Sequence, residues 1–144
     1  MDKNQHYRKL ENMYHGHPLN TVFKARLTIQ ERKTELLITV NPELFHAANA
    51  VHGAVYFKAL DDAAFFAANS IVFDVFVLTT AFTTYLTRPV SSGELRSIGQ
   101  LVSQNRSQYI AEAVLYNNGV EVGRGTGMYV RSKMLLSEVE GYSF

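Results

Sequence analysis

The sequence contains no cysteine among its 144 residues, and this absence excludes several kinds of chemistry together. Without thiols the chain has no disulfide framework, no thiolate nucleophile, no cysteine-based zinc finger and no thiolate-bound iron–sulfur cluster. Any chemistry that it performs therefore depends on carboxylates, imidazoles, hydroxyls or backbone groups.

The net charge is almost zero as well, because 14 Lys and Arg residues and 13 Asp and Glu residues leave a formal charge of +1. No large positive field attracts nucleic acid or an anionic membrane, so we expect no nucleic-acid partner. Proline and glycine are few, and the hydrophobic fraction of 47% is that of a globular protein. The length predicts one domain over residues 1–144, with an N-terminal helical region at 1–17 and a C-terminal tail at 132–144.

The sequence lacks a clear targeting or membrane segment. Its polar N-terminus has no apolar core of a secretory signal, which predicts a cytoplasmic location. The apolar stretch 63–82 has about the length of a membrane span. Asp74 lies near its centre and Asn69 interrupts it, so we expect no membrane span but a buried helix followed by a buried strand.

Apolar periodicity predicts the first half of the fold. Asp2 is placed to cap a helix that runs to about Tyr14 and ends before Pro18. Alternating residues predict strands over 23–30 and 36–40. A segment that is apolar nearly all round and rich in alanine predicts a buried helix from Gly53 to about Ser70.

Four strands are predicted after this helix, over residues 76–86, 94–104, 108–117 and 120–131. Asn118-Gly119 fits a type I′ hairpin turn. Gly123, Gly125 and Gly127 share one face of the last strand, and we expect the helix to rest on this strip. The order of elements predicts an α+β domain, with an antiparallel sheet around one long central helix and an additional N-terminal helix.

The start of the long helix carries the most informative motif, His52-Gly53-Ala54, with Asp61 nine residues after the histidine. It resembles the hotdog-fold acyl-CoA thioesterases of the phenylacetic-acid-degradation type, whose helix opens with His-Gly-Gly and carries an acidic residue at this spacing. The resemblance extends to the strand end 86–90 and the Gly119 hairpin. It implies a hotdog fold and hydrolysis of an acyl-CoA, or of an acyl-carrier-protein thioester, with coenzyme A as part of the substrate and no metal or other cofactor.

The family resemblance also implies roles for Gly53 and Asp61. The free N–H at the start of the helix suits the negative charge of an attacked thioester carbonyl. Asp61 is then the nucleophile or the general base that deprotonates water. The two residues lie about 12 Å apart along a helix, so one chain cannot bring both to one thioester. Antiparallel helices across a two-fold axis would do so, which predicts a homodimer or a dimer of dimers.

The residues next to Asp61 and Gly53 each have a structural role as an alternative. Asp62 points about 100° away from Asp61 and is placed to pair with Lys58. His52 either orients the thioester or caps the loop before the helix, and Ala54 replaces the second glycine of the family motif.

Three polar residues are candidates for holding the substrate or water. His46 stands where the family commonly has Asn or Gln, and Asn49 is a possible substitute for that amide. Thr79 stands where relatives carry a hydroxyl that orients water, although a β-branched strand residue needs no such role.

Substrate binding has further candidates. Arg88 and Arg106 lie near predicted strand ends and are candidates for contacting the phosphates of coenzyme A. Phe57 is a candidate wall of the acyl pocket, together with Tyr56, Phe65 and Tyr85, and ordinary core packing is the alternative for each.

Other activities remain open at this point. A hotdog hydratase or dehydratase is one alternative, and a protein that binds acyl-CoA without hydrolysing it is another. His15 and His17 form an H-x-H pair with no third ligand at a recognised spacing, so we expect a surface loop there and no metal site.

Overall fold

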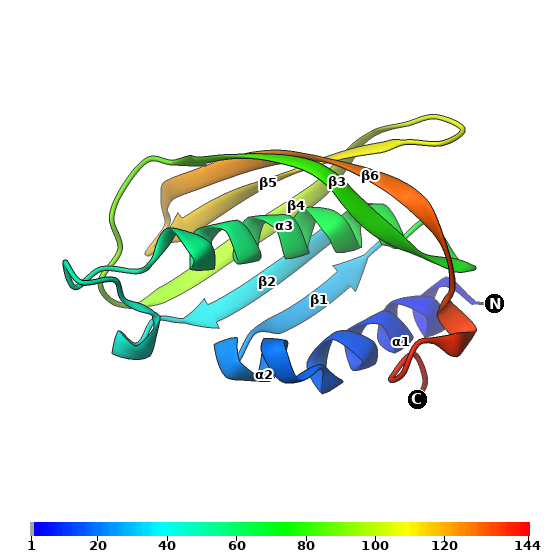
Figure 1. The fold of residues 1–144 in the computed structure, drawn as a ribbon, viewed down its shortest axis with the longest axis horizontal. Helices are drawn as coiled ribbons and strands as arrows, with labels where there is room; N and C mark the ends of the chain where they lie inside the picture. The colour runs from blue at the N-terminus through cyan, green and yellow to red at the C-terminus, as the bar shows by residue number, and fades with distance from the viewer. Residues whose placement is uncertain (1) are drawn as a thin grey trace.

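The computed structural model describes residues 2–144, which form a six-stranded antiparallel sheet curved around one long helix (Figure 1). The strand order is β1-β2-β4-β5-β6-β3. This arrangement confirms the expected α+β architecture. The strands are β1 (Arg26–Gln30), β2 (Lys33–Thr39), β3 (Val75–Leu86), β4 (Glu94–Gln104), β5 (Tyr109–Asn117) and β6 (Val120–Leu135). The helices are α1 (Lys3–Gly16), α2 (Pro18–Phe23) and α3 (Gly53–Asn69), with short 3-10 turns η1 (Pro42–Leu44) and η2 (Leu136–Glu138).

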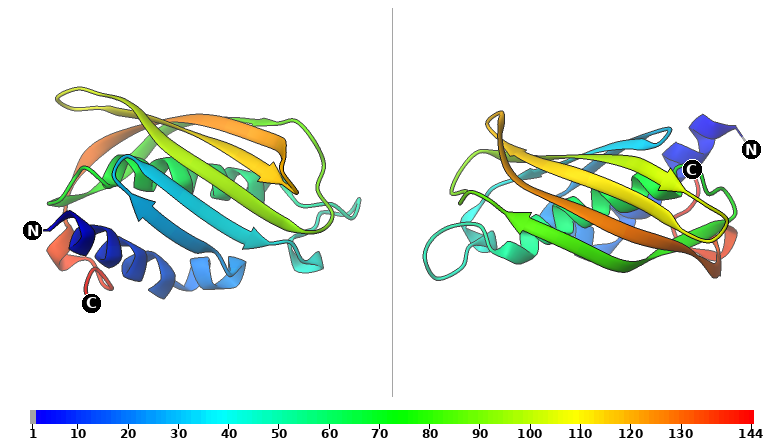
Figure 2. Two further views of the ribbon diagram at one scale, coloured as in Figure 1. Left: turned by 180° about the vertical axis from the view of Figure 1, so that it is seen from behind. Right: turned by 90° about the horizontal axis from the view of Figure 1, so that it is seen from above.

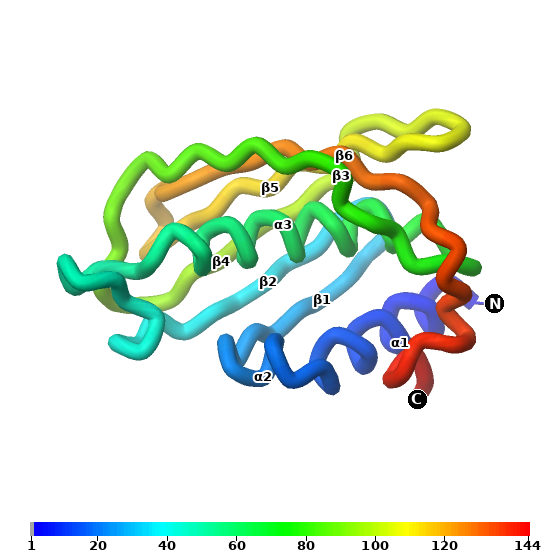
Figure 3. Tube along the Cα trace, viewed as in Figure 1, coloured from blue at the N-terminus to red at the C-terminus, as the bar shows by residue number. Residues whose placement is uncertain are grey.

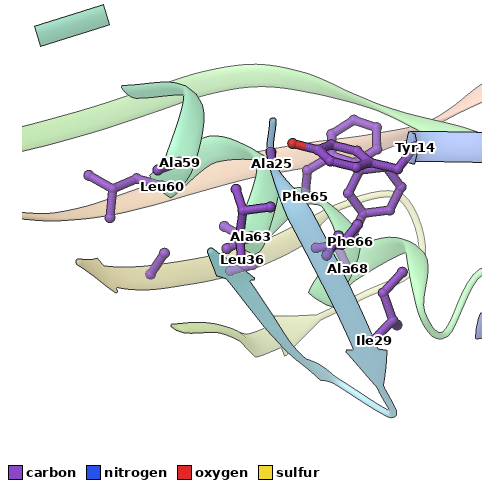
Figure 4. Close-up of a cluster of buried hydrophobic side chains, with 14 of the residues drawn as sticks. Tyr14, Ala25, Ile29, Leu36, Ala59, Leu60, Ala63, Phe65, Phe66 and Ala68 are labelled. Atoms are coloured by element: carbon purple, nitrogen blue, oxygen red, sulfur yellow. The ribbon is translucent and has the colours of Figure 1, made fainter. Parts of the chain in front are cut away.

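The buried core lies between α3 and the concave face of the sheet (Figure 4). The alanines of α3 from Ala59 to Ala68 are fully buried, as the apolar pattern predicts, whereas Ala54 in its first turn is exposed. Residues 63–82 comprise the end of the buried helix α3 and the start of β3, as expected. Residues 78–81 of β3 are exposed, so the prediction of a buried strand was wrong there, because β3 lies at the edge of the sheet. No helix within residues 2–144 has the length and apolar character that crossing a membrane requires.

The glycine that permits close helix–sheet packing differs from the prediction. A Cβ on Gly99 of β4 would lie 2.2 Å from the carbonyl oxygen of Ala63, so α3 rests directly on this position. The strip at Gly125 and Gly127 is instead covered by the ring of Phe82 from the neighbouring strand β3. The expectation that α3 covers the whole strip was therefore wrong, because the strand next to β6 fills most of that space.

The N-terminal segment follows the prediction up to its second helix. Asp2 caps α1 by accepting a hydrogen bond from the backbone N–H of Asn4. Phe23, however, belongs to α2, and Lys24 ends that helix in the left-handed conformation. The strand predicted over 23–30 therefore begins at Arg26. His15 and His17 lie at the end of α1 and the cap of α2, so the predicted surface loop is wrong.

The C-terminal residues 132–144, predicted as a tail, include the end of a strand and a short helical turn. β6 continues to Leu135, four residues beyond its predicted end, and η2 follows it. The chain then lies against α1, as the two views in Figure 2 show. His6 contacts the Tyr142 hydroxyl through Nδ1 at 2.6 Å, and the Asn12 side chain donates to the Ser143 carbonyl.

The two edges of the sheet differ in the partners of their outward backbone groups. Side chains of α1 satisfy the outward backbone groups of β1: the Leu27 N–H donates to His15 Nε2, and the Ile29 N–H donates to Glu11. Among residues 2–144, β3 pairs only with β6, so its outer edge has no strand partner. One edge is therefore closed by α1 and the other is open for pairing.

Candidate active site

Asp61 lies in the middle of α3, and its side chain is held by two hydroxyl groups. Tyr129 donates to Asp61 Oδ1 at 3.0 Å, and Thr79 donates to the same oxygen at 3.1 Å. The second oxygen, Oδ2, has only a long contact of 3.5 Å with Thr79. One carboxylate oxygen is therefore occupied and the other is left for a ligand or water.

The two hydroxyl donors come from adjacent strands at one register position. Thr79 of β3 and Tyr129 of β6 face each other across the ladder, and cross-strand partners share a face of the sheet. An irregularity in the register follows between Thr79 and Ala81. Pairing with the buried Tyr129 places the Thr79 side chain toward the helix, and the bulge changes which side chains point inward after it.

Tyr129 was missed by the sequence reasoning, although a signal for it exists. It continues the inward-facing alternation of Gly123, Gly125 and Gly127 by one further step along β6. Its side chain is fully buried. A buried tyrosine needs a partner for its hydroxyl, and the nearest helix supplies Asp61.

The environment of Asp61 raises the pKa of its carboxyl group. Burial is the main cause, because an apolar surrounding disfavours the charged form, and the nearby charge of Asp62 acts in the same direction. The hydrogen bonds from Tyr129 and Thr79 lower the pKa and offset part of this effect. A carboxyl with a raised pKa next to a cavity has the properties of a general acid or base.

Asp62 has a different environment, as the helical spacing predicted. It forms an ion pair with Lys58 at 2.8 Å and accepts a hydrogen bond from the Tyr14 hydroxyl. Lys58 also donates to Asn20, so the network joins α3 to α1 and α2. Asp62 therefore fixes the N-terminal helices, while Asp61 remains without an ion pair among the described residues.

The start of α3 presents one free backbone donor. His52 is the N-cap, and its Nδ1 accepts a hydrogen bond from the Ala54 N–H at 2.9 Å. Gly53 occupies the first helical position, where no acceptor within the helix exists, and its N–H has no partner among residues 2–144. The capping alternative for His52 is thus realised, and it leaves the Gly53 N–H available.

The loop before α3 places His46 beside His52. Their ring centroids are 6.5 Å apart in an edge-on arrangement. His46 Nδ1 accepts a hydrogen bond from the Ala48 N–H. Since an accepting Nδ1 carries no proton, the neutral rings of both histidines carry theirs on Nε2. Asn49 lies in this loop with a positive φ of 65°, and its backbone N–H donates to the His46 carbonyl.

A pocket of about 730 Å³ lies next to Asp61 and Thr79. Of the four aromatic residues predicted as acyl-pocket walls, Phe65 lines this pocket, whereas Tyr56, Phe57 and Tyr85 do not. Phe57 is instead 43% exposed and packs edge-on against Phe82. Gly53 and His52 are also absent from the lining of this pocket, so one chain brings together only the Asp61 half of the predicted site.

The two candidate arginines lie in separate parts of the chain. Arg88 follows β3 near the start of α3, where its carbonyl accepts a hydrogen bond from the Tyr56 hydroxyl. Arg106 lies in the β4–β5 turn, which projects beyond the sheet at the other end of α3 (Figure 3). Neither guanidinium forms an ion pair within the described part of the chain. In one chain they do not converge on a common ligand.

Metal binding has no obvious location in residues 2–144, since no three His, Asp or Glu side chains cluster as ligands there.

The sequence and the fold were compared with those of known proteins. The model of the thioesterase superfamily matches residues 48–123, which include the start of α3, Asp61 and Thr79. No curated protein matches the sequence significantly.

Solved structures share the whole fold at low sequence identity. The PaaI protein from the phenylacetic acid degradation operon of E. coli has a TM-score of 0.83 and 18% identity, over 92% of this chain and 97% of that one. A mutant of the phenylacetic acid degradation protein PaaI from Thermus thermophilus has a TM-score of 0.74 and 15% identity, over 81% and 100%. A conserved protein from Pseudomonas aeruginosa has a TM-score of 0.77 and 19% identity, over 81% and 94%. At these identities the likeness establishes a common fold.

Proposed function

Because the chain belongs to the thioesterase superfamily, we propose that it hydrolyses an acyl-CoA thioester to a free carboxylic acid and coenzyme A. The observation that carries this proposal is the environment of Asp61. Its carboxyl has a raised pKa, two hydroxyl groups fix it, and it faces a pocket in which water and a thioester can meet. This combination suits proton transfer better than structural pairing.

The hydrogen bonds of Asp61 favour the role of general base. Oδ1 accepts from both Thr79 and Tyr129, and this leaves Oδ2 to take a proton from a water molecule. The hydroxide equivalent attacks the thioester carbonyl carbon, and the carbon–sulfur bond breaks as the tetrahedral intermediate collapses. Asp61 then returns the proton to the departing thiolate, so that the products are an acid and a thiol.

The negatively charged oxygen of the tetrahedral intermediate requires a hydrogen-bond donor, and Gly53 of the same chain lies too far from Asp61 to supply it. Gly53 begins α3 and Asp61 lies eight residues later, about 12 Å along the helix axis. The Gly53 N–H, without a partner and at the positive end of the helix dipole, suits the developing charge. We assign this role to Gly53 of the partner subunit in a homodimer with antiparallel α3 helices.

The sheet edges support such a dimer. α1 blocks β1, whereas β3 has an unpaired edge that includes Thr79. Two copies that pair through β3 around a two-fold axis form a closed assembly with two equivalent sites. Antiparallel pairing also brings the end of one chain that carries Arg106 toward the end of the other that carries Arg88. Both arginines are then available to the phosphates of one coenzyme A, as substrate-binding residues.

His46 and His52 complete the proposed site at the start of α3. Their Nδ1 atoms are occupied by backbone N–H groups of their own loops, so their Nε2–H groups are the donors available to the substrate. Capping by His52 also keeps the Ala54 N–H occupied. Both histidines therefore act as positioning groups around the Gly53 N–H.

Substitution of Asp61 tests the activity. A panel of acyl-CoA substrates is assayed for released thiol, and the absence of cysteine removes the protein background from this assay. Asp61→Asn should reduce kcat by about 10²–10⁴-fold, the usual contribution of a general base. Asp74→Asn is the matched control, because it removes the same charge from an exposed carboxylate at the start of β3. Full activity of Asp61→Asn would refute the mechanism. Tight binding of acyl-CoA without turnover by the wild-type protein would favour a binding protein instead.

Mixing two inactive variants tests whether sites are shared between chains. Asp61→Asn and Gly53→Pro are unfolded and refolded together so that subunits exchange at random. Half of the dimers are then hybrids and each hybrid has one intact site, so about one quarter of the wild-type activity should return. If both residues served a site within one chain, mixing would restore nothing.

A further inference from the structure

The pocket beside Asp61 is built largely by segments outside the part of the chain that matches the family model. The end of α1 and the start of α2, residues 13–20, form one wall. Residues 134–141, at the end of β6 and beyond it, form another. The family match covers residues 48–123, so both of these walls come from the terminal segments on either side of it.

The interior of the pocket is mainly apolar and aromatic. Tyr14, Phe65, Phe66 and Phe76 contribute rings, and Phe65 lies between its two phenylalanine neighbours at centroid distances of 4.9 and 5.1 Å. Figure 4 shows the Tyr14, Phe65 and Phe66 side chains gathered at this place. The volume of about 730 Å³ lies in the range of roughly 300–1,000 Å³ typical of small-molecule pockets.

The charged groups of the pocket disfavour an anionic acyl group. Asp61, Asp62 and Glu140 place carboxylates along its lining. The nearest ammonium, Lys58, is already paired with Asp62 and hydrogen-bonded to Asn20. His17 lies on the exposed rim. A terminal carboxylate on the substrate would therefore meet like charges and find no free cation inside.

Both outer walls are held in place in the absence of a ligand. The Tyr14 hydroxyl donates to Asp62, and the Asn20 side chain donates to the Tyr14 carbonyl, which fixes the α1–α2 junction on α3. Contacts of His6 with Tyr142 and of Asn12 with Ser143 hold the C-terminal segment on α1. A pocket with fixed walls binds a chain without a large ordering cost.

We infer that this pocket takes the acyl chain, and that the substrates are uncharged, nonpolar acyl-CoA thioesters longer than butanoyl. The inference rests on the proposed function, since it names the acyl class at the Asp61 site. The thioester lies at Asp61 and Thr79, and the chain extends from there between α1–α2 and the C-terminal segment. The two terminal segments that form the walls of the pocket therefore determine chain-length specificity.

Inert thioether analogues of coenzyme A with butyl or decyl chains test the inference separately from catalysis. Each buried methylene should tighten binding by about fourfold. The decyl analogue has about six more methylenes than the butyl analogue, and burial of only two of them should already make it bind the wild-type protein at least about tenfold more tightly. In hydrolysis assays, decanoyl-CoA should be preferred to butanoyl-CoA, and succinyl-CoA should be a poor substrate.

Leu19→Trp provides the specificity variant, and Val22→Trp provides its control. Both residues are exposed on α2, but only Leu19 lines the pocket. Leu19→Trp should reduce the decyl-to-butyl affinity ratio by about tenfold, because the indole narrows the cavity, whereas Val22→Trp should leave the ratio unchanged.

Equal affinity of the two analogues, or an unchanged ratio in Leu19→Trp, would overturn the inference even if thioesters are hydrolysed. Chain-length-dependent binding that Leu19→Trp weakens, without hydrolysis of any thioester, would uphold the assigned pocket and refute the proposed catalytic function.

Discussion

Replacement of Gly53 by proline removes one N–H group from the start of α3 and changes little else. Proline is favoured at the first position of a helix, where the N–H has no intrahelical acceptor. The preceding residue must be extended, and His52 already has φ −63° and ψ 144°. The substitution should therefore change the free energy of unfolding by no more than about 1 kcal/mol.

Gly53→Pro should nevertheless abolish most of the activity. Loss of one oxyanion donor typically reduces kcat by about 10²–10³-fold, which corresponds to about 2.7–4 kcal/mol of transition-state stabilisation. No neighbouring group compensates, because the next N–H along the helix, that of Ala54, is occupied by His52. The assay is thiol release from a saturating acyl-CoA, with thermal unfolding measured in parallel.

Gly53→Ala separates the lost hydrogen bond from the added bulk. It retains the N–H and adds a Cβ that would lie 3.2 Å from Leu86 Cδ1, the flexible end of a side chain. Its kcat should stay within a fewfold of the wild-type value. If Gly53→Ala loses as much activity as Gly53→Pro, space rather than the N–H matters at this position. If Gly53→Pro keeps near-normal kcat, the oxyanion assignment is wrong.

Two further substitutions test the electrostatics of the site and the packing of the fold. Tyr129→Phe removes a donor that lowers the pKa of Asp61. The pKa of Asp61 should therefore rise in this variant. Because activity requires the ionised carboxylate, the acid limb of the plot of kcat against pH should move to higher pH. An unmoved limb would exclude Asp61 as the titrating base. Gly99→Ala should destabilise the protein by more than about 3 kcal/mol in urea unfolding, because its Cβ would meet the Ala63 carbonyl at 2.2 Å. Gly16→Ala, which meets nothing within 4 Å, is the control, and equal unfolding midpoints for the two would contradict the close approach.

Local patterns predicted most elements of the fold, because the spacing of apolar residues and the positions of turn and capping residues agree along most of the chain. The Gly53 helix and the four strands after it start and end within one residue of their predicted bounds, except for the end of β6, which lies four residues later. Phe23 was misassigned because it continues the alternation of the following strand, while Pro18 starts a short helix that ends at Phe23. The strip at Gly125 and Gly127 was misassigned because a strand pattern does not identify which neighbour covers it.

The candidate site was predictable where it depends on one helix. The 100° between consecutive helical residues separated Asp61 from Asp62, and the structure gives them separate partners. Tyr129 and the pocket walls from the two ends of the chain were not predicted, because both depend on tertiary packing. The β3–β6 register places Tyr129 opposite Thr79, and the pocket walls come from opposite ends of the sequence.

The adjacent aspartates differ in what their charges contribute to folding. Asp62 is compensated by Lys58 and Tyr14 and joins three helices. Asp61 has a raised pKa, so the folded state binds its proton more readily than the unfolded state. Its contribution to stability is then greatest when the carboxyl is protonated and decreases as pH rises through the folded pKa. The charged form of Asp61 thus costs folding free energy in the isolated chain, and in the proposed mechanism this charged form is the base that accepts the proton of water.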